Sequence, residues 1–138
     1  MPKLNGIKET CLTVTDLERS KRFYIETFEL PIIGGDDARF CAFDVAGSHV
    51  LLLFLHGTSE QPIELPGGTI PSHGAGGRSH LAFAISADEL DRWKAWLAER
   101  GVAIEGTVTW PLGGTSVYFR DPDAHLLELI TPGVWSTY

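Results

Sequence analysis

An internal repeat constrains this chain more than any other feature of its sequence. Residues 43–49 and 119–125 each begin with Phe and end with His, and they lie 76 residues apart. The apolar stretches that follow them, residues 50–53 and 126–129, keep the same offset. A repeat of this length in a chain of 138 residues predicts one structural motif that is present twice. Because each half has too little apolar core to be stable alone, we expect the halves to pack together.

The same order of elements is expected in both halves. Strands are predicted from apolar and β-branched residues, and helices from a capping residue followed by apolar residues at helical spacing. In the first half the expected elements are a strand at 7–14, a helix after Asp16, and strands at 39–45 and 49–55. In the second half they are a strand at 79–85, a helix after Ser86, and strands at 103–109, 115–119 and 126–131. The residues Pro31 and Gly34–Gly35 predict turns after the first helix.

The segment that joins the halves, residues 56–78, is rich in Gly and Pro and is expected to be a long loop. Loops of this length within compact domains are usually functional lids or linkers. A lid over the functional site is favoured, and a plain connector is the alternative.

The composition excludes several classes of partner. The net charge is −7 and no run of Lys or Arg occurs, so nothing would neutralise the phosphates of a nucleic acid or an anionic membrane. The longest apolar run, residues 50–55, is too short to cross a bilayer. The only two cysteines, Cys11 and Cys41, lie within expected strands. A disulfide framework is therefore not expected, whereas a cytoplasmic location is expected.

Three polar residues stand in otherwise apolar strands, namely Glu9, His80 and Glu128. Glu128 lies between Leu127 and Leu129. A carboxylate in such a strand is costly to bury unless it is paired or bound to a metal. The three residues are therefore candidates for a metal site.

Alternation along the strands indicates what surrounds these candidates. His80 shares its face with Ala82 and Ala84, and Glu9 shares its face with Cys11. Such small neighbours leave space beside the polar groups. Two carboxylates and an imidazole suit one divalent Zn, Mn, Ni, Co or Fe(II) ion and leave positions open for water or a chelating substrate. The residues alone equally allow ordinary ion-paired carboxylates and a core histidine.

Several stretches of the chain resemble the vicinal-oxygen-chelate superfamily, which contains glyoxalases, bleomycin-resistance proteins and extradiol dioxygenases. The stretches are residues 9–17, 23–24, 80–83 and 118–129. The last is the most specific, because it places Phe-Arg-Asp-Pro-Asp before a Leu-Glu-Leu strand. The repeat and the resemblance together predict an α+β fold, with two βαβββ modules forming an open mixed β-barrel and the helices packed outside. One domain over residues 1–138 is expected, with modules at about 5–56 and 79–133 and the loop at about 57–78.

The resemblance also implies which residues bind the metal. Ligands in the superfamily lie at the start of the first strand, at the start of the fifth and late in the eighth, which correspond here to Glu9, His80 and Glu128. Extradiol dioxygenases and fosfomycin-modifying enzymes usually have His at the position of Glu9. Glyoxalase I has a further Glu at about the position of Leu52. Membership of the superfamily is thus expected, while the exact reaction stays open.

Three functions follow from these observations. The first is a glyoxalase-like lyase or isomerase, in which the metal polarises a small oxygen-chelating substrate and Glu128 or Glu9 moves a proton. The others are an Fe(II) extradiol-type dioxygenase and a metal-free protein that sequesters a drug. His73 is a candidate general acid/base, although loop histidines are more often simply solvated. Trp110 and Trp135 are candidates for lining a substrate pocket, and the resemblance implies a homodimer.

Overall fold

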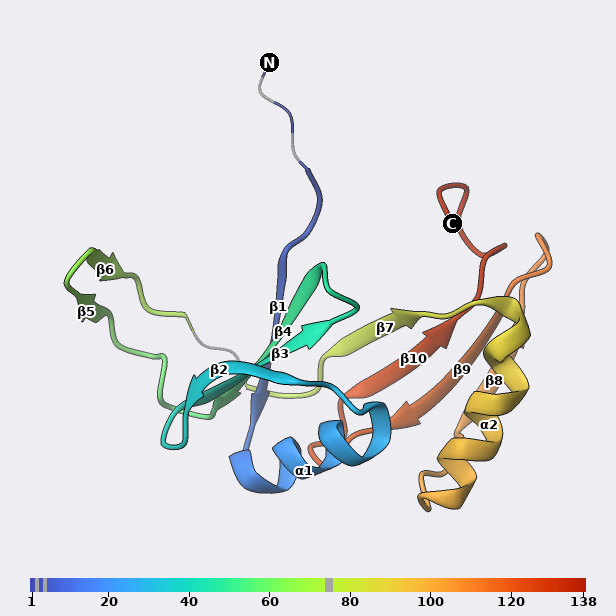
Figure 1. Cartoon of the computed structure of the whole chain (residues 1–138), viewed down its shortest axis with the longest axis horizontal. Helices are drawn as coiled ribbons and strands as arrows, with labels where there is room; N and C mark the ends of the chain where they lie inside the picture. The colour runs from blue at the N-terminus through green and yellow to red at the C-terminus, as the bar shows by residue number, and fades with distance from the viewer. Residues whose placement is uncertain (2, 4, 74–75) are drawn as a thin grey trace. The chain divides into compact units, whose positions relative to one another are not determined.

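The chain follows the order βαβββ twice, with a hairpin between the two halves (Figure 1). The computed structural model describes residues 1–138 except residues 2, 4, 74 and 75. The first half, module one, comprises β1 (Glu9–Val14), α1 (Leu17–Phe28), β2 (Ile32–Asp36), β3 (Phe40–Val45) and β4 (His49–Leu55). The hairpin comprises β5 (Ile63–Leu65) and β6 (Gly68–Ile70). The second half, module two, comprises β7 (His80–Ala84), the 3-10 turn η1 (Ala87–Glu89), α2 (Leu90–Glu99), β8 (Gly106–Thr109), β9 (Thr115–Arg120) and β10 (Leu126–Ile130).

Each module forms its own four-stranded sheet with the same topology. The strand order is β1-β4-β3-β2 in the first sheet and β7-β10-β9-β8 in the second. The strands β1 and β4 are parallel, as are β7 and β10, whereas the other neighbours are antiparallel. The predicted α+β class with two βαβββ modules is therefore confirmed. Both sheets are open, and neither closes into a barrel.

The chain divides into two compact units, Met1–Gly77 and Arg78–Tyr138. The single domain expected over residues 1–138 stays a prediction. None of the described helices combines the length and the apolar character that spanning a membrane requires.

The two modules match each other in strand register. Val50 lies opposite Glu9 in module one, and Leu126 lies opposite His80 in module two. Val50 and Leu126 are separated by the 76 residues of the sequence repeat, and Glu9 and His80 are separated by 71 residues. Because register decides which side chains share a face of a sheet, equivalent residues of the two modules occupy equivalent faces.

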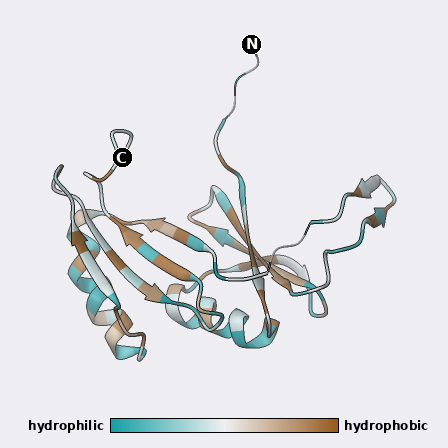
Figure 2. Cartoon of the chain, turned by 180° about the vertical axis from the view of Figure 1, so that it is seen from behind, coloured by the Kyte–Doolittle hydropathy of each residue, from teal (hydrophilic) through white to brown (hydrophobic). Residues whose placement is uncertain are grey.

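One face of each sheet carries the apolar core of its module. In module one, α1 packs against β3 and β4, and the ring of Tyr24 lies 6.1 Å from that of Phe43. The almost fully buried side chains on this face are Leu12, Val14, Phe43, Leu51 and Leu53. In module two they are Val117, Phe119, Leu127 and Leu129. Figure 1 shows α2 running beside β8 and β9, and Figure 2 shows the hydrophobic segments along the strands of both sheets. We call the opposite face of each sheet its site face.

The structure corrects the sequence-based expectation at the edge of module one. Ile32–Asp36 forms the edge strand β2, although the two glycines within it predicted a turn. Gly35 has a φ of +134°, and a Cβ there would lie 2.5 Å from the carbonyl oxygen of Phe40. Glycine is therefore required at this position by close approach of β3 and not by a reversal of the chain.

Two further expectations need correction. The segment predicted as a structureless loop contains the β5–β6 hairpin, because Ile63 and Ile70 pair across a tight turn. The helix predicted to begin at a Ser86 cap begins instead at Leu90, after the turn η1, and Ser86 makes no side-chain capping hydrogen bond. By contrast, Asp16 caps α1 as predicted.

Candidate functional site

Glu128 lies at the centre of the module two sheet. It stands on β10, which is flanked by β7 and β9, directly opposite Ala82 and Tyr118. Its neighbours Leu127 and Leu129 fill the core on the other face. Alternation therefore turns the carboxylate onto the site face, where it is only 5% exposed. A carboxylate buried to this extent requires partners.

The first partner of Glu128 is His80, from the start of β7. His80 Nε2 lies 3.1 Å from Glu128 Oε2, and His80 Nδ1 lies 2.9 Å from the carbonyl oxygen of Leu126. A carbonyl oxygen only accepts hydrogen bonds, so Nδ1 carries the ring proton of a neutral imidazole. The lone pair of Nε2 then faces a carboxylate oxygen, which is also an acceptor. A cation is needed between the two atoms, either an added proton on the ring or a metal ion.

The distance between these two atoms also fits a shared metal. Two ligand atoms held about 2.1 Å from one ion lie about 3.0 Å apart at a right angle and about 3.4 Å apart at the tetrahedral angle. The separation of 3.1 Å between His80 and Glu128 falls within this range. The hydrogen bond from the other ring nitrogen to a backbone carbonyl is the usual support of a metal-binding histidine. The pair therefore suits a divalent ion.

The second partner of Glu128 is Tyr118, on β9. Burial raises the pKa of the Tyr118 phenol; a hydrogen bond with Ser116 lowers it, and the charge of Glu128 and a hydrogen bond to its side chain raise it. A phenol that stays protonated donates to the carboxylate and holds it in place. The Tyr118 ring also lies 6.3 Å from the imidazole of His80. Sequence reasoning missed this residue, because an aromatic residue in a strand is ordinary core until its register opposite Glu128 is known.

The start of β7 is held by a buried histidine. His125 is fully buried, and its Nδ1 accepts a hydrogen bond of 2.9 Å from the backbone N–H of Ser79. Ser79 directly precedes His80, so this contact fixes the backbone from which the imidazole projects. The repeat carries the signal for this residue, because His125 and His49 occupy equivalent positions at the ends of the repeated stretches.

The third predicted ligand, Glu9, lies in the other unit. It begins β1, is exposed, and shares the site face of module one with Cys11. Burial raises the pKa of the Cys11 thiol, and the nearby Glu9 carboxylate raises it further. As far as each unit is described, no third His, Cys, Asp or Glu joins His80 and Glu128 to complete a metal-binding group. The three-residue ligand set thus stays a prediction.

His73, the predicted acid/base, also belongs to the first unit. Its ring packs edge-on against Phe54 at 4.7 Å, and its backbone N–H donates to the carbonyl of Ser59. Phe54 pairs with Thr13, four residues along β1 from Glu9. At about 3.3 Å per residue, Phe54 and Glu9 are separated by roughly 13 Å along the sheet. The structure therefore does not bring His73 to Glu9.

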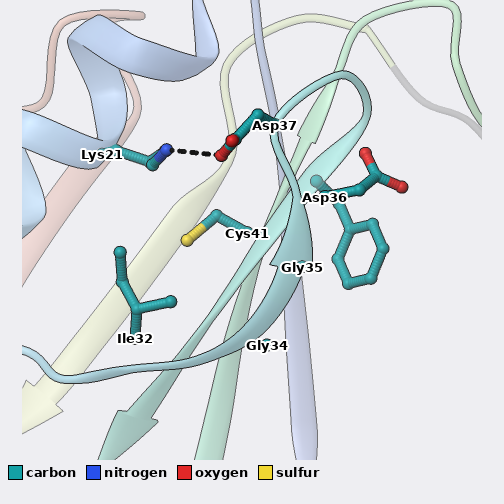
Figure 3. A pocket seen from close by; sticks show the side chains of 8 residues that line it. Lys21, Ile32, Gly34, Gly35, Asp36, Asp37 and Cys41 are labelled. Atoms are coloured by element: carbon teal, nitrogen blue, oxygen red, sulfur yellow. Dashed lines mark hydrogen bonds and ion pairs between the residues drawn. The ribbon is translucent and has the colours of Figure 1, made fainter.

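A cavity of about 280 Å³ lies between α1 and β2 in module one (Figure 3). It holds none of the predicted site residues. The lysine at its wall, Lys21, is neutralised by Asp37 at 3.2 Å and by Glu18 at 2.6 Å. Neither His80 nor Glu128 lines this cavity.

Comparisons with known proteins agree with this architecture. A metallothiol transferase FosB from Staphylococcus epidermidis is 30% identical over 133 residues, covering 94% of this chain and 83% of that protein. A fosfomycin resistance protein FosX from Listeria innocua is 28% identical over 133 residues, covering 91% and 89%. The crystal structure of a lactoylglutathione lyase from Agrobacterium tumefaciens is similar with a TM-score of 0.88 and 29% identity, covering 98% of this chain and 99% of that one. The sequence profile of the Glyoxalase/Bleomycin resistance protein/Dioxygenase superfamily matches residues 6–129, and the chain belongs to this superfamily.

Proposed function

We propose that this protein is a divalent-metal-dependent enzyme whose substrate is a small molecule that chelates through neighbouring oxygens. Glu9, His80 and Glu128 are the proposed ligands of one Zn, Mn, Ni, Co or Fe(II) ion. The observation that carries the proposal is the separation of 3.1 Å between His80 Nε2 and Glu128 Oε2, which fits two ligands of one ion. Because Nδ1 is already committed to a carbonyl, a cation satisfies both groups at once.

The surrounding residues of module two prepare the pair for this role. The carbonyl of Leu126 orients the imidazole so that Nε2 points toward Glu128. The Tyr118 hydroxyl donates a hydrogen bond to the Glu128 carboxylate and limits its rotation. A divalent ion, when bound, supplies a Lewis acid that polarises a substrate carbonyl and stabilises developing negative charge.

Proton transfer beside such a carbonyl is the lyase or isomerase chemistry that we assign first. Glu9 is the first proposed base, because its carboxylate is exposed and free of the constraints that bury Glu128. Glu128 is the second proposed base. His73 is the proposed acid/base for a substrate that extends along the site face of module one. The likeness to a lactoylglutathione lyase from Agrobacterium tumefaciens supports this assignment.

Thiol transfer to a small molecule is the second candidate, and the name metallothiol transferase of a relative that covers 94% of this chain favours it. Both candidates use the same metal site. They differ in whether a carboxylate removes a proton or an incoming thiol attacks the substrate. For either reaction we propose a homodimer, as the superfamily resemblance implies, and a cytoplasmic location, which the two free cysteines favour.

Elemental analysis of protein purified without a metal-affinity column tests the proposal. We expect about one equivalent of divalent metal in the parent, and a loss of at least about ten-fold in affinity for Glu128→Gln and His80→Ala. His49→Ala is the control, because His49 is an exposed histidine at the start of β4 in module one, where its ring forms a hydrogen bond of 2.8 Å with the hydroxyl of Ser48. It should keep the metal.

The metal-loaded protein would then be assayed on hemithioacetals of α-ketoaldehydes and, with an added thiol, on fosfomycin. Turnover of the first with loss in Glu9→Gln supports the lyase or isomerase, and thiol addition to the second supports transfer. A parent that holds no metal, even after loading with Zn, Mn, Ni and Fe(II), would overturn both candidates.

A further inference from the structure

An aromatic surface adjoins the His80–Glu128 pair on the site face of module two. Tyr118 lies between Glu128 and Gly106 in the strand register, since it is opposite both. The same face of the β8 segment continues through Val108 to Trp110. We call Gly106, Val108, Trp110 and Tyr118 the aromatic shelf. Its residues are half-buried or exposed, so their surfaces are accessible within this unit.

Gly106 leaves the ring of Tyr118 uncovered, and the backbone conformation at this position does not itself require a glycine. Its φ lies outside the left-handed region, and a Cβ built on it would meet Tyr118 Cδ2 at 3.9 Å, an ordinary contact. A Cβ is therefore accommodated here without a clash. In module one the equivalent position is Gly34, where a Cβ would lie 3.9 Å from the Cβ of Ala42. Only in module two does the glycine expose an aromatic ring.

Trp110 is fixed at the far end of the shelf. Its indole N–H donates a hydrogen bond of 2.8 Å to the hydroxyl of Ser116, which is fully buried. Ser116 lies two residues before Tyr118 on the same face of β9. The strand β9 therefore fixes the positions of both the Trp110 and the Tyr118 rings. A rigid aromatic surface is preorganised for stacking, because little side-chain entropy remains to be lost on binding.

The charge of this face argues against an anionic ligand at the shelf. Arg120 is the only Lys or Arg in the strands β7, β8, β9 and β10. Its guanidinium is already used, by Glu105 at 3.1 Å and by the carbonyl of Ala124 at 3.0 Å. A phosphonate placed beside Glu128 would therefore meet a buried carboxylate without a free cation from these strands, apart from the metal itself.

We propose that the substrate carries an uncharged planar group next to its metal-binding oxygens, and that this group stacks on the aromatic shelf. The inference rests on the proposed function, because the metal positions the oxygens at His80 and Glu128. It goes further in naming the substrate class: an aromatic or conjugated oxygen chelator rather than a small phosphonate.

Three chelating probes test the proposal by calorimetry on the metal-loaded protein. Acetohydroxamate and benzohydroxamate bind metals through the same two oxygens and differ in a methyl or a phenyl group, whereas phosphonoformate carries additional negative charge. We expect benzohydroxamate to bind about ten-fold more tightly than acetohydroxamate, and to quench tryptophan fluorescence. Gly106→Ala should reduce this preference and Gly106→Leu should remove it, with the metal content unchanged in both variants. Gly34→Leu, the equivalent change in module one, should leave the preference intact.

The outcomes separate this inference from the proposed function. Metal bound at one site, together with equal affinity for the two hydroxamates, overturns the shelf and leaves the metal site standing. Tighter binding of phosphonoformate than of benzohydroxamate also overturns the shelf. Absence of metal in the loaded parent overturns the proposed function and removes this inference with it.

Discussion

The two modules share one backbone plan and differ in what their site faces carry. Leu52 and Ala42 in module one stand at the register positions that Glu128 and Tyr118 occupy in module two. The helix-covered faces, by contrast, are apolar and buried in both modules. The two faces of each sheet therefore place different requirements on the sequence. Burial of one face maintains the fold, and the other face is therefore free to carry a buried carboxylate and its tyrosine partner in one module and small or apolar side chains at the same two register positions in the other.

The largest expected effect tests whether the cores are equivalent. Phe43 and Phe119 are equivalent in the repeat, and both are fully buried. Phe43→Ala and Phe119→Ala should each lower the free energy of unfolding by about 3–5 kcal/mol, because each deletes a ring and leaves a cavity. Denaturant titration followed by circular dichroism measures both.

The shape of the unfolding transition tests whether the two modules form one domain. If the modules form one domain, as expected from their small separate cores, each variant should unfold in a single transition. Two separated transitions in Phe43→Ala, with module two unfolding as in the parent, would show that the modules are independent domains.

A second, smaller effect should follow from making module two resemble module one. In Glu128→Leu the buried carboxylate is replaced by the residue found at the equivalent position of module one, Leu52. We expect the metal-free variant to be more stable than the metal-free parent by about 1–2 kcal/mol, because the buried carboxylate no longer has to be desolvated and its partner His80, whose side chain is half exposed, can be solvated by water. Thermal unfolding in the presence of a chelator measures the difference.

The control for this variant is Glu9→Leu. Glu9 is exposed, so its replacement should change the stability of the metal-free protein by less than about 0.5 kcal/mol. A metal-free Glu128→Leu protein that is less stable than the parent would mean that Glu128 is a structural residue, and its role as a ligand would lose its main support.

Sequence reasoning located the strands that are rich in apolar residues and missed the short or glycine-containing strands β2, β5 and β6. The strands β4 and β10 were predicted because they are apolar and recur in the repeat. The strand Ile32–Asp36 was missed because all of its residues are exposed and two of them are glycine. An edge strand of this kind is held by pairing with β3 and not by burial, so hydropathy carries little signal for it.

The candidate site shows the same division. Polar residues in apolar strands marked His80 and Glu128 as candidates, and the superfamily resemblance predicted that the two belong to one site. Tyr118 could not, since its contact with Glu128 depends on antiparallel register, which neither residue type nor periodicity reveals. The place of Glu9 in the same site rests on the superfamily resemblance and stays a prediction.

The smallest expected effect concerns the starts of the two helices, where the modules differ in a way the repeat does not suggest. The Asp16 carboxylate accepts a 2.9 Å hydrogen bond from the backbone N–H of Arg19 and caps α1, whereas Ser86 makes no side-chain capping bond before η1. Asp16→Ala should therefore lower the free energy of unfolding by about 1 kcal/mol, and Ser86→Ala by less than about 0.5 kcal/mol. Equal losses measured by denaturant titration would show that Ser86 does cap its helix in solution, and the two modules would then begin their helices alike. The expected inequality would instead place the difference between the modules in their helix starts as well as in their site faces.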